Sequence, residues 1–453
     1  MTDPDPSPAP AETPPPVPSQ AQQHYHGAIA QVAGSGRLRA QDAIYSDKGV
    51  KLLERGARVD GKLYARLARV TLRGSLDEQL AVDDMVTVQA VEQLALQLCQ
   101  DDTLAYLLAH ALGAGASARL VAPLRAMLLP HPLAFRLTVM REQHHSLYVH
   151  SVRMMLVALY LGVKSGWSER ECVHLAAAGL LHDIGVLDLD PVWHDPNNRI
   201  TGAGRAQLMA HPVSAMQAIQ AQGVYPRTVE QAVLEHHESL DGSGYPHGLA
   251  GEQISPMGQI LLLAEVVAAF FEKYAGQAAA QRLALTLKLN HRKFPAALAA
   301  HLLPVLEIRA VQAPVEVVQG DVERAIAQLE QALAQWQQCA AGLPPEALQP
   351  PSEQPCAFVE QQLAALQKTL FEAGTHPQQL ADALPLLQGD AQSLAELALL
   401  GREALWQLQS IVNATHSRWP QLPDSPGPCA AAVLRWRQAC GQHPAPDAPA
   451  PVA

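Results

Sequence analysis

The chain has 453 residues, of which 48% are hydrophobic, 5% aromatic and 17% charged. This length suits about three domains, and a composition rich in alanine and leucine but poor in aromatics favours helices over sheets. Lysine and arginine total 32 against 43 aspartates and glutamates, a formal net charge of −11. Because nucleic acids and anionic membranes bind positive surfaces, this charge argues against DNA or a membrane as the main partner.

The six cysteines are scattered along the chain, and none forms a CxxC pair. This pattern argues against a disulfide framework and a structural zinc site, and it favours a reducing compartment. The acidic, proline-rich start shows no secretory signal, and the best apolar run, residues 260–271, is too short to span a membrane. We therefore expect a soluble, cytoplasmic protein.

Five segments are expected, and the fold class is all-α. Residues 1–22 form a disordered proline-rich leader, and residues 425–453 form a similar Pro/Ala-rich tail. Residues 23–130 form a mainly helical domain with a small β patch at residues 43–53. Residues 131–312 form a helical, histidine-rich domain, with helices at residues 149–163, 169–182 and 228–236.

A C-terminal helical bundle is expected over residues 313–424. Apolar side chains recur there at alternating spacings of four and three residues: Val322, Ile326, Leu329, Leu333 and Trp336. Two such heptads are too few for a coiled coil. The stripe therefore predicts a bundle core more strongly than a groove for a partner, and the bundle packs on the rest of the chain, on a protein partner or on a second copy.

Histidine is unusually concentrated in the middle of the chain. Ten of the 19 histidines lie between His144 and His247, a window of 104 residues. A His-Asp dipeptide, His182-Asp183, follows an apolar helical run, where neighbouring side chains can reach two adjacent metal positions and a carboxylate can bridge them. By itself such a pair is more often a buried, hydrogen-bonded structural pair.

Further candidate ligands surround this dipeptide in the sequence. Glu265 lies inside an apolar helix, where an unpaired carboxylate would cost several kcal/mol, so a metal would be a suitable partner. The combination predicts a metal site built from His150, His182, Asp183, His211, His236, His237 and Glu265. The remaining histidines of the window are expected to be bystanders.

The order of these residues, with HDIG at 182–185 and HHES followed by DGSGYP at 236–246, resembles the HD-GYP family of the HD phosphohydrolase superfamily. The resemblance covers about residues 144–274. It implies an all-helical HD domain with two divalent ions, iron or manganese, bridged by Asp183. It also implies hydrolysis of cyclic di-GMP to the linear dinucleotide in bacterial signalling, with a hydroxide between the two metals attacking phosphorus.

Carried onto this chain, the resemblance assigns catalysis to His182 and Asp183. It assigns the rim of the substrate site to the loop that comprises Asp241, Gly242, Gly244, Tyr245 and Pro246. The glycines would give this loop its backbone freedom. The tyrosine would stack on or hydrogen bond to the nucleotide, or it would simply be packed.

Four positions depart from the family pattern. Lysines usually occupy the places of Val186 and Met209, and an arginine that of Gln259, so three charges that would hold phosphate are missing. Glu265 replaces an aspartate, and residues 144–247 carry ten acidic against six basic side chains. Two alternatives therefore stay open: a weak or inactive module that binds nucleotide or a protein partner, and a phosphohydrolase of another nucleotide.

Overall fold

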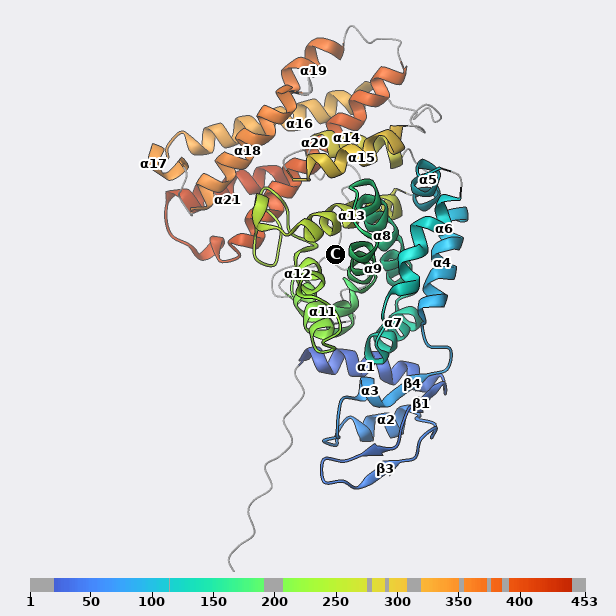
Figure 1. The fold of residues 1–453 in the computed structure, drawn as a ribbon. Coiled ribbons are helices and arrows are strands. Elements are labelled where there is room, and N and C mark those ends of the chain that lie inside the picture. Colours follow the sequence, from blue (N-terminus) through green and yellow to red (C-terminus); the bar gives the residue numbers. More distant parts are fainter. Residues whose placement is uncertain are drawn as a thin grey trace, which may run out of the picture.

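A computed structural model gives the structure of the chain and describes residues 20–113, 115–190, 207–274, 279–289, 293–307, 319–349, 354–372, 376–384 and 391–441. The all-α class with a small β patch is confirmed. Figure 1 shows a small β-containing end, a central group of helices and a helical bundle at the opposite end. The expected leader, residues 1–22, lies almost entirely outside the described residues, as do residues 442–453 of the expected tail.

The N-terminal part combines short strands with helices. The strands form two antiparallel pairs, β1 with β4 and β2 with β3. The second pair lies within the predicted patch, whereas the first joins Leu38 to Val82 across 44 positions of sequence. The elements are α1 Gln20–Gly34, β1 Leu38–Ala40, β2 Ile44–Tyr45, β3 Lys51–Leu53, α2 Gly61–Leu67, α3 Leu76–Gln79, β4 Leu80–Val82, α4 Val88–Asp101, α5 Thr103–Ala111, α6 Ala116–Val121 and η1 Ala122–Ala126.

Among the described residues of the histidine-rich part, the regular elements are helices, apart from one isolated bridge between Asp241 and Ala250. Its helix α9 begins with a capping box, in which Ser168 and Glu171 satisfy each other's free backbone N–H groups. The elements are α7 His131–Gln143, α8 His145–Lys164, α9 Glu169–Leu181, η2 Ile184–Asp188, α11 His211–Gln220, α12 Arg227–Glu235, η4 Gly251–Gln253, α13 Pro256–Lys273, α14 Ala279–Leu289 and α15 Ala296–Glu307. The three predicted helices correspond to α8, α9 and α12.

One hydrophobic core joins the first two parts, since buried side chains from Tyr25 to Leu306 form a single cluster. Its central helix, α8, is long and apolar enough by length and composition to cross a membrane. However, 72% of its apolar window is buried inside the protein, and α8 packs against α9 and α13. Its burial is that of a core helix.

The C-terminal part is a helical bundle with its own core. All five residues of the predicted apolar stripe are buried, so the interpretation of the stripe as bundle core is confirmed. The helices are α16 Gln319–Ala340, α17 Pro345–Leu348, α18 Pro355–Glu372, α19 Pro377–Ala383, α20 Ala391–Arg418, η6 Leu422–Asp424 and α21 Pro428–Gly441. The last of these extends the bundle into the segment that was expected to be a tail.

A disulfide joins Cys356, at the start of α18, to Cys429, at the start of α21. This corrects the expectation that the scattered cysteines form no disulfide. The two residues are 73 positions apart, but the packing of α18 against α21 brings their Cα atoms to 5.6 Å. No local spacing pattern signals such a pair.

The bundle contacts the histidine-rich part through α14, α20 and Lys293. Thr286 donates a hydrogen bond to Glu403 at 2.9 Å, and the Lys293 ammonium lies 5.8 Å from the centre of the Trp406 ring. The backbone carbonyl of Lys293 accepts a hydrogen bond from the amide of Leu240, directly before the DGSGYP loop. The bundle therefore packs next to the segment that carries this loop.

Candidate metal centre

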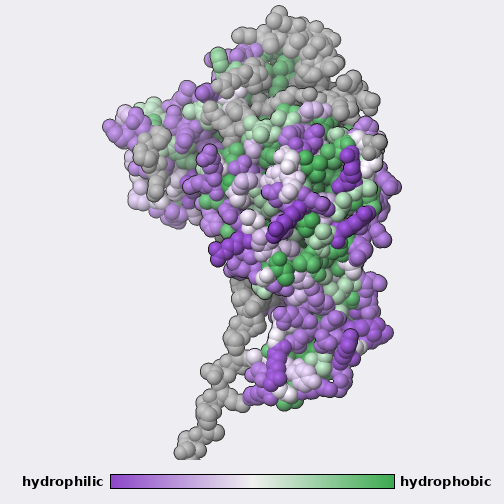
Figure 2. Space-filling model, in the orientation of Figure 1, coloured by the Kyte–Doolittle hydropathy of each residue, from purple (hydrophilic) through white to green (hydrophobic). Residues whose placement is uncertain are grey.

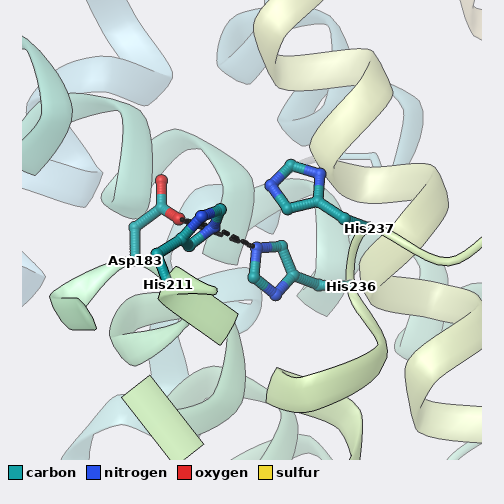
Figure 3. A group of neighbouring side chains, drawn as sticks. All are labelled: Asp183, His211, His236 and His237. Atoms are coloured by element: carbon teal, nitrogen blue, oxygen red, sulfur yellow. Dashed lines mark hydrogen bonds and ion pairs between the residues drawn. The ribbon is translucent and has the colours of Figure 1, made fainter. Parts of the chain in front are cut away.

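All seven predicted metal ligands lie together in the middle of the histidine-rich part. His150 comes from α8, and His182 and Asp183 follow α9. His211 opens α11, His236 and His237 follow α12, and Glu265 lies in α13. Five separate elements thus contribute, and six of the seven side chains are buried while His237 is half-buried. Figure 3 shows Asp183, His211, His236 and His237 converging on one point.

The seven side chains form two adjacent groups. His150, His182 and Glu265 form one, and Asp183, His211, His236 and His237 form the other; within each group the ligand atoms lie within 4.8 Å of one another. In the first group, Glu265 Oε2 lies 3.0 Å from His150 Nε2 and 3.3 Å from His182 Nε2. Each group has the nitrogen and oxygen donors that suit iron, manganese or zinc.

Asp183 lies between the two groups. Its Oδ2 atom is 3.1 Å from His182 Nε2, in the first group. Its Oδ1 atom is 3.1 Å from His211 Nε2 and 3.6 Å from His236 Nε2, in the second. One oxygen of the same carboxylate therefore faces each group, as the resemblance implied for a bridging ligand.

Backbone carbonyls orient three of the imidazole rings. The Nδ1 atoms of His182, His211 and His236 lie 2.9, 2.6 and 2.6 Å from the carbonyl oxygens of the residues three positions earlier. A carbonyl can only accept, so each Nδ1 carries the hydrogen, and in a neutral ring Nε2 keeps a free lone pair. The lone pairs point inward.

These lone pairs fit a cation better than they fit each other. The Nε2 atoms of His211 and His236 face one another at 3.3 Å, and two such acceptors repel unless a proton or a metal lies between them. His182 Nε2, His237 Nε2 and Asp183 Oδ1 are buried without a hydrogen-bond partner. Buried polar atoms without partners are costly, so the donor set fits divalent ions.

The charges in the centre shift its ionisation. Burial alone would lower the pKa of His182, but the adjacent Asp183 raises it to about 9. Burial acts against the charged form of Asp183 too, yet His182 and the neighbouring histidines hold its pKa well below the usual range. Burial lowers the pKa of His236 and His237, and neighbouring histidines lower that of His237 further. The centre thus mixes charged and neutral ligands.

A second carboxylate lies within ion-pair distance of His150. Glu272 Oε1 lies 3.1 Å from His150 Nδ1, on the opposite nitrogen from Glu265, and Glu272 also pairs with Arg153. Carboxylates in this position orient a metal-binding imidazole and make it a stronger donor. Glu272 was not among the predicted site residues, although it follows Glu265 by seven residues on α13 and therefore lies on the same helix face.

The DGSGYP loop packs beside the second group. The Tyr245 ring stacks on His237, with centroids 4.7 Å apart and an angle of 21° between the planes. Asp241 Oδ1 accepts hydrogen bonds from the amide and the hydroxyl of Ser243, so this carboxylate shapes the loop. Gly242 has φ of +75°, which favours glycine, and Pro246 follows Tyr245 in a cis peptide bond.

Glu238 was not among the predicted site residues. Its carboxylate anchors the backbone that follows the DGSGYP loop. Its side chain is buried, and its two oxygens accept from the amides of His247 at 2.7 Å and Leu249 at 2.9 Å. A Cβ atom on Gly244 would lie 2.4 Å from Glu238 Cα, so only glycine allows this approach. The loop is thereby tied to the helix end that carries His236 and His237.

Two of the positions that depart from the family pattern, Val186 and Gln259, make neutral contacts in the structure. Val186 is buried in a small apolar cluster with Leu189 and Leu208. The Gln259 amide donates to the backbone carbonyl of Ile254 at 3.1 Å, just before the start of α13. Neither position brings positive charge to the metal centre.

Comparison with known proteins shows what the histidine-rich part is similar to. Residues 136–293 match the model of the HD domain. The cyclic di-GMP phosphodiesterase PA4108 of Pseudomonas aeruginosa is 30% identical over 149 residues, 32% of this chain and 36% of the relative. The 3'3'-cGAMP-specific phosphodiesterase 3 of Vibrio cholerae is 30% identical over 117 residues, 26% of this chain and 25% of the relative.

The chain spans only 25–36% of the length of these two relatives. A solved structure, Bd1817, an HDG"Y"P protein from Bdellovibrio bacteriovorus, aligns with a TM-score of 0.32 at 18% identity, covering 59% of this chain and 95% of that chain. The family model and the sequence matches confirm the resemblance to HD-GYP proteins that the histidine motifs indicated.

Proposed function

We propose that this protein is a metal-dependent phosphodiesterase that hydrolyses cyclic di-GMP to the linear dinucleotide. The observation that carries the proposal is the pair of ligand groups with Asp183 between them. Two ions held side by side suit the hydrolysis of a phosphodiester better than they suit a purely structural role. Relatives named as cyclic di-GMP phosphodiesterases support the choice of substrate.

The proposed roles follow from the positions of the side chains. His150, His182 and Glu265 would hold one ion, His211, His236 and His237 the other, and Asp183 would contact both. Bound there, two divalent ions would lower the pKa of a water molecule and neutralise the phosphodiester oxygens. The backbone-anchored imidazoles keep the ligand set in place before the substrate arrives.

Substrate recognition would use the DGSGYP loop. Tyr245 already stacks on His237, and its ring would either continue that stack with a guanine or close the side of the site. Gly242, Gly244 and Pro246 would set the path of the rim, and Asp241 would fix the loop through Ser243. Since Val186, Met209 and Gln259 bring no charge, the ions would supply nearly all the attraction for phosphate.

A second candidate is hydrolysis of 3'3'-cGAMP, because three of the relatives carry that name. To test both, protein loaded with Fe(II) or Mn(II) is incubated with each dinucleotide, the products are separated by chromatography, and metal content is measured on the same preparation. We expect turnover of cyclic di-GMP that a His182→Ala, Asp183→Ala variant loses.

Other outcomes discriminate among the alternatives. Faster turnover of 3'3'-cGAMP would mean that the protein is a phosphodiesterase whose preferred substrate is 3'3'-cGAMP. If wild-type protein with a full metal content is as inactive as the double variant but binds a dinucleotide in calorimetry, the non-catalytic module is correct. Wild-type protein that binds neither metal nor nucleotide would refute both readings.

A further inference from the structure

Positive charge is concentrated in one segment of the β-containing end, residues 37–73, which is followed by four acidic residues within 74–84, of which Asp83 pairs with Arg39. Residues 37–73 contain ten basic and four acidic side chains, a net charge of +6, whereas the rest of the chain has 22 basic and 39 acidic side chains, a net charge of −17. The net charge of −11 hides this difference. We call residues 37–73 the basic tip; in Figure 1 they lie at the lower end, away from the C-terminal bundle.

Backbone pairing brings the segments of the basic tip together. The amide of Asp47 donates to the carbonyl of Thr71 at 3.0 Å, and the amide of Arg73 donates to the carbonyl of Tyr45 at 3.1 Å. The turn between β2 and β3 therefore lies beside the segment that follows α2. Basic residues from the strands, the helix and this segment therefore belong to one compact unit.

Most of the basic side chains on this surface are exposed. Lys62, Arg66 and Arg69 follow one another at i, i+4 and i+7 along α2 and its end, which places them on one face. All three are exposed, as are Arg58 and Arg73, and none of the five makes a salt bridge with another described residue. Their charges are directed at solvent.

Two apolar side chains are exposed among these charges. Val50 is 60% exposed and lies between Gly49 and Lys51, and Val70 is 41% exposed and follows Arg69. The pairing of Asp47 with Thr71 places the segments of the two valines next to each other. The lower lobe in Figure 2 is otherwise mainly hydrophilic on the face shown.

We propose that the basic tip docks the protein on the surface of an anionic lipid bilayer. Clustered basic residues bind the negative headgroups, and exposed valines among them can enter the interfacial layer. The acidic remainder of the chain is repelled by the same surface, so only the tip would face it. The metal centre would then be held near the membrane.

Two other anionic partners fit the tip less well. A single-stranded nucleic acid stacks its bases on exposed aromatic rings, but of the two tyrosines in the tip Tyr64 is buried and Tyr45 half-buried. An acidic protein would pair with the charges but gives the two valines no specific role. Both partners remain outcomes of the test.

The test measures flotation of the full chain with vesicles of equal parts phosphatidylglycerol and phosphatidylcholine, against vesicles of phosphatidylcholine alone. We expect binding only to the anionic vesicles, weakening as ionic strength rises toward about 0.15 M. Each basic residue near an anionic surface contributes about fivefold, so Lys62→Glu with Arg66→Glu and Arg69→Glu should weaken binding by more than about 100-fold, because each reversal also adds a repelled charge. Neutral Gln replacements at the same three sites should have a smaller effect.

The matched control reverses three exposed charges on the histidine-rich part, Lys164→Glu, Arg170→Glu and Arg227→Glu, which changes the net charge equally. It should bind vesicles like the wild type. Equal circular dichroism and metal content of all variants exclude misfolding. The proposal is overturned if the wild type ignores anionic vesicles, if the two triple variants bind equally, or if polyglutamate or single-stranded RNA binds and vesicles do not compete.

Discussion

The Glu272 carboxylate lies 3.1 Å from Nδ1 of His150, while Glu265 lies 3.0 Å from Nε2 of the same ring. One imidazole is thus held between two carboxylates of a single helix, seven residues apart. Only Glu265 belongs to the ligand group, and the other carboxylate is partly exposed, at 35% of its side chain. Glu272 is therefore well placed to orient His150 without holding the ion.

We expect Glu272→Gln to weaken metal binding about 10- to 100-fold, the usual effect of removing a carboxylate that orients a metal-binding histidine. Competition with a chelator, followed by metal analysis, measures the affinity. Glu252→Gln, at an exposed glutamate of η4, is the matched control and should leave it unchanged. Equal metal affinities of the two variants would show that Glu272 does not contribute to metal binding.

Asp183→Asn should lower the metal content of both ligand groups at once, because one oxygen of Asp183 faces each group. The amide keeps the shape of the side chain but loses its charge. Metal analysis should show fewer than half of the wild-type ions per chain, and phosphodiesterase activity should fall with them. Asp241→Asn, in the loop, should retain its metal; a loss in both variants would point to misfolding instead.

Gly185→Ala should displace His211. A Cβ atom on Gly185 would lie 2.2 Å from the His211 carbonyl oxygen and 2.6 Å from the Ala215 amide, both of them backbone atoms of α11. The helix must shift, so we expect lower stability and loss of metal from the second group first. Gly27→Ala, in α1, meets no atom within 4 Å and should stabilise the fold by up to about 1 kcal/mol. Similar melting temperatures for Gly185→Ala and Gly27→Ala would contradict the close contact between Gly185 and α11.

Metal-free protein should be most stable near pH 6.5. His182 has its pKa raised to about 9, so its stabilising contribution is complete below pH 6.5 and is lost as pH rises through 9. His236 and His237 have lowered pKa values, so their contribution is lost as pH falls below 6.5. Urea unfolding of chelator-treated protein checks both limbs. Stability that is unchanged between pH 6.5 and 9.5, or equal in wild type and His182→Gln there, would contradict the assignment.

The ligand set could be predicted from the sequence because it depends on residue type and local order. Local patterns mark most of these residues: a His-Asp pair after one apolar helix, a His-His pair after another, and a glutamate inside a third. The structure brings all seven residues together. The helices followed from apolar spacing in the same way. Their ends differ from the predicted ones by a few residues.

The supporting interactions could not be predicted in this way. Glu238 is buried by a loop that begins after it, and its partners are backbone amides nine and eleven residues away. The pairing of β1 with β4 and the bond between Cys356 and Cys429 both depend on how distant segments pack. The net charge of the whole chain likewise gave no sign of the basic tip, because a sum over 453 residues does not show where the charges lie.

The bond between Cys356 and Cys429 has a practical consequence for handling this protein. It closes a loop that contains most of α18 and all of α19 and α20, together with the largely exposed connection at residues 419–427. A chain cut once within that loop would keep both pieces attached and would run as an intact molecule on a non-reducing gel. Only under reductant would the two fragments separate, so a preparation judged whole without it can already be nicked.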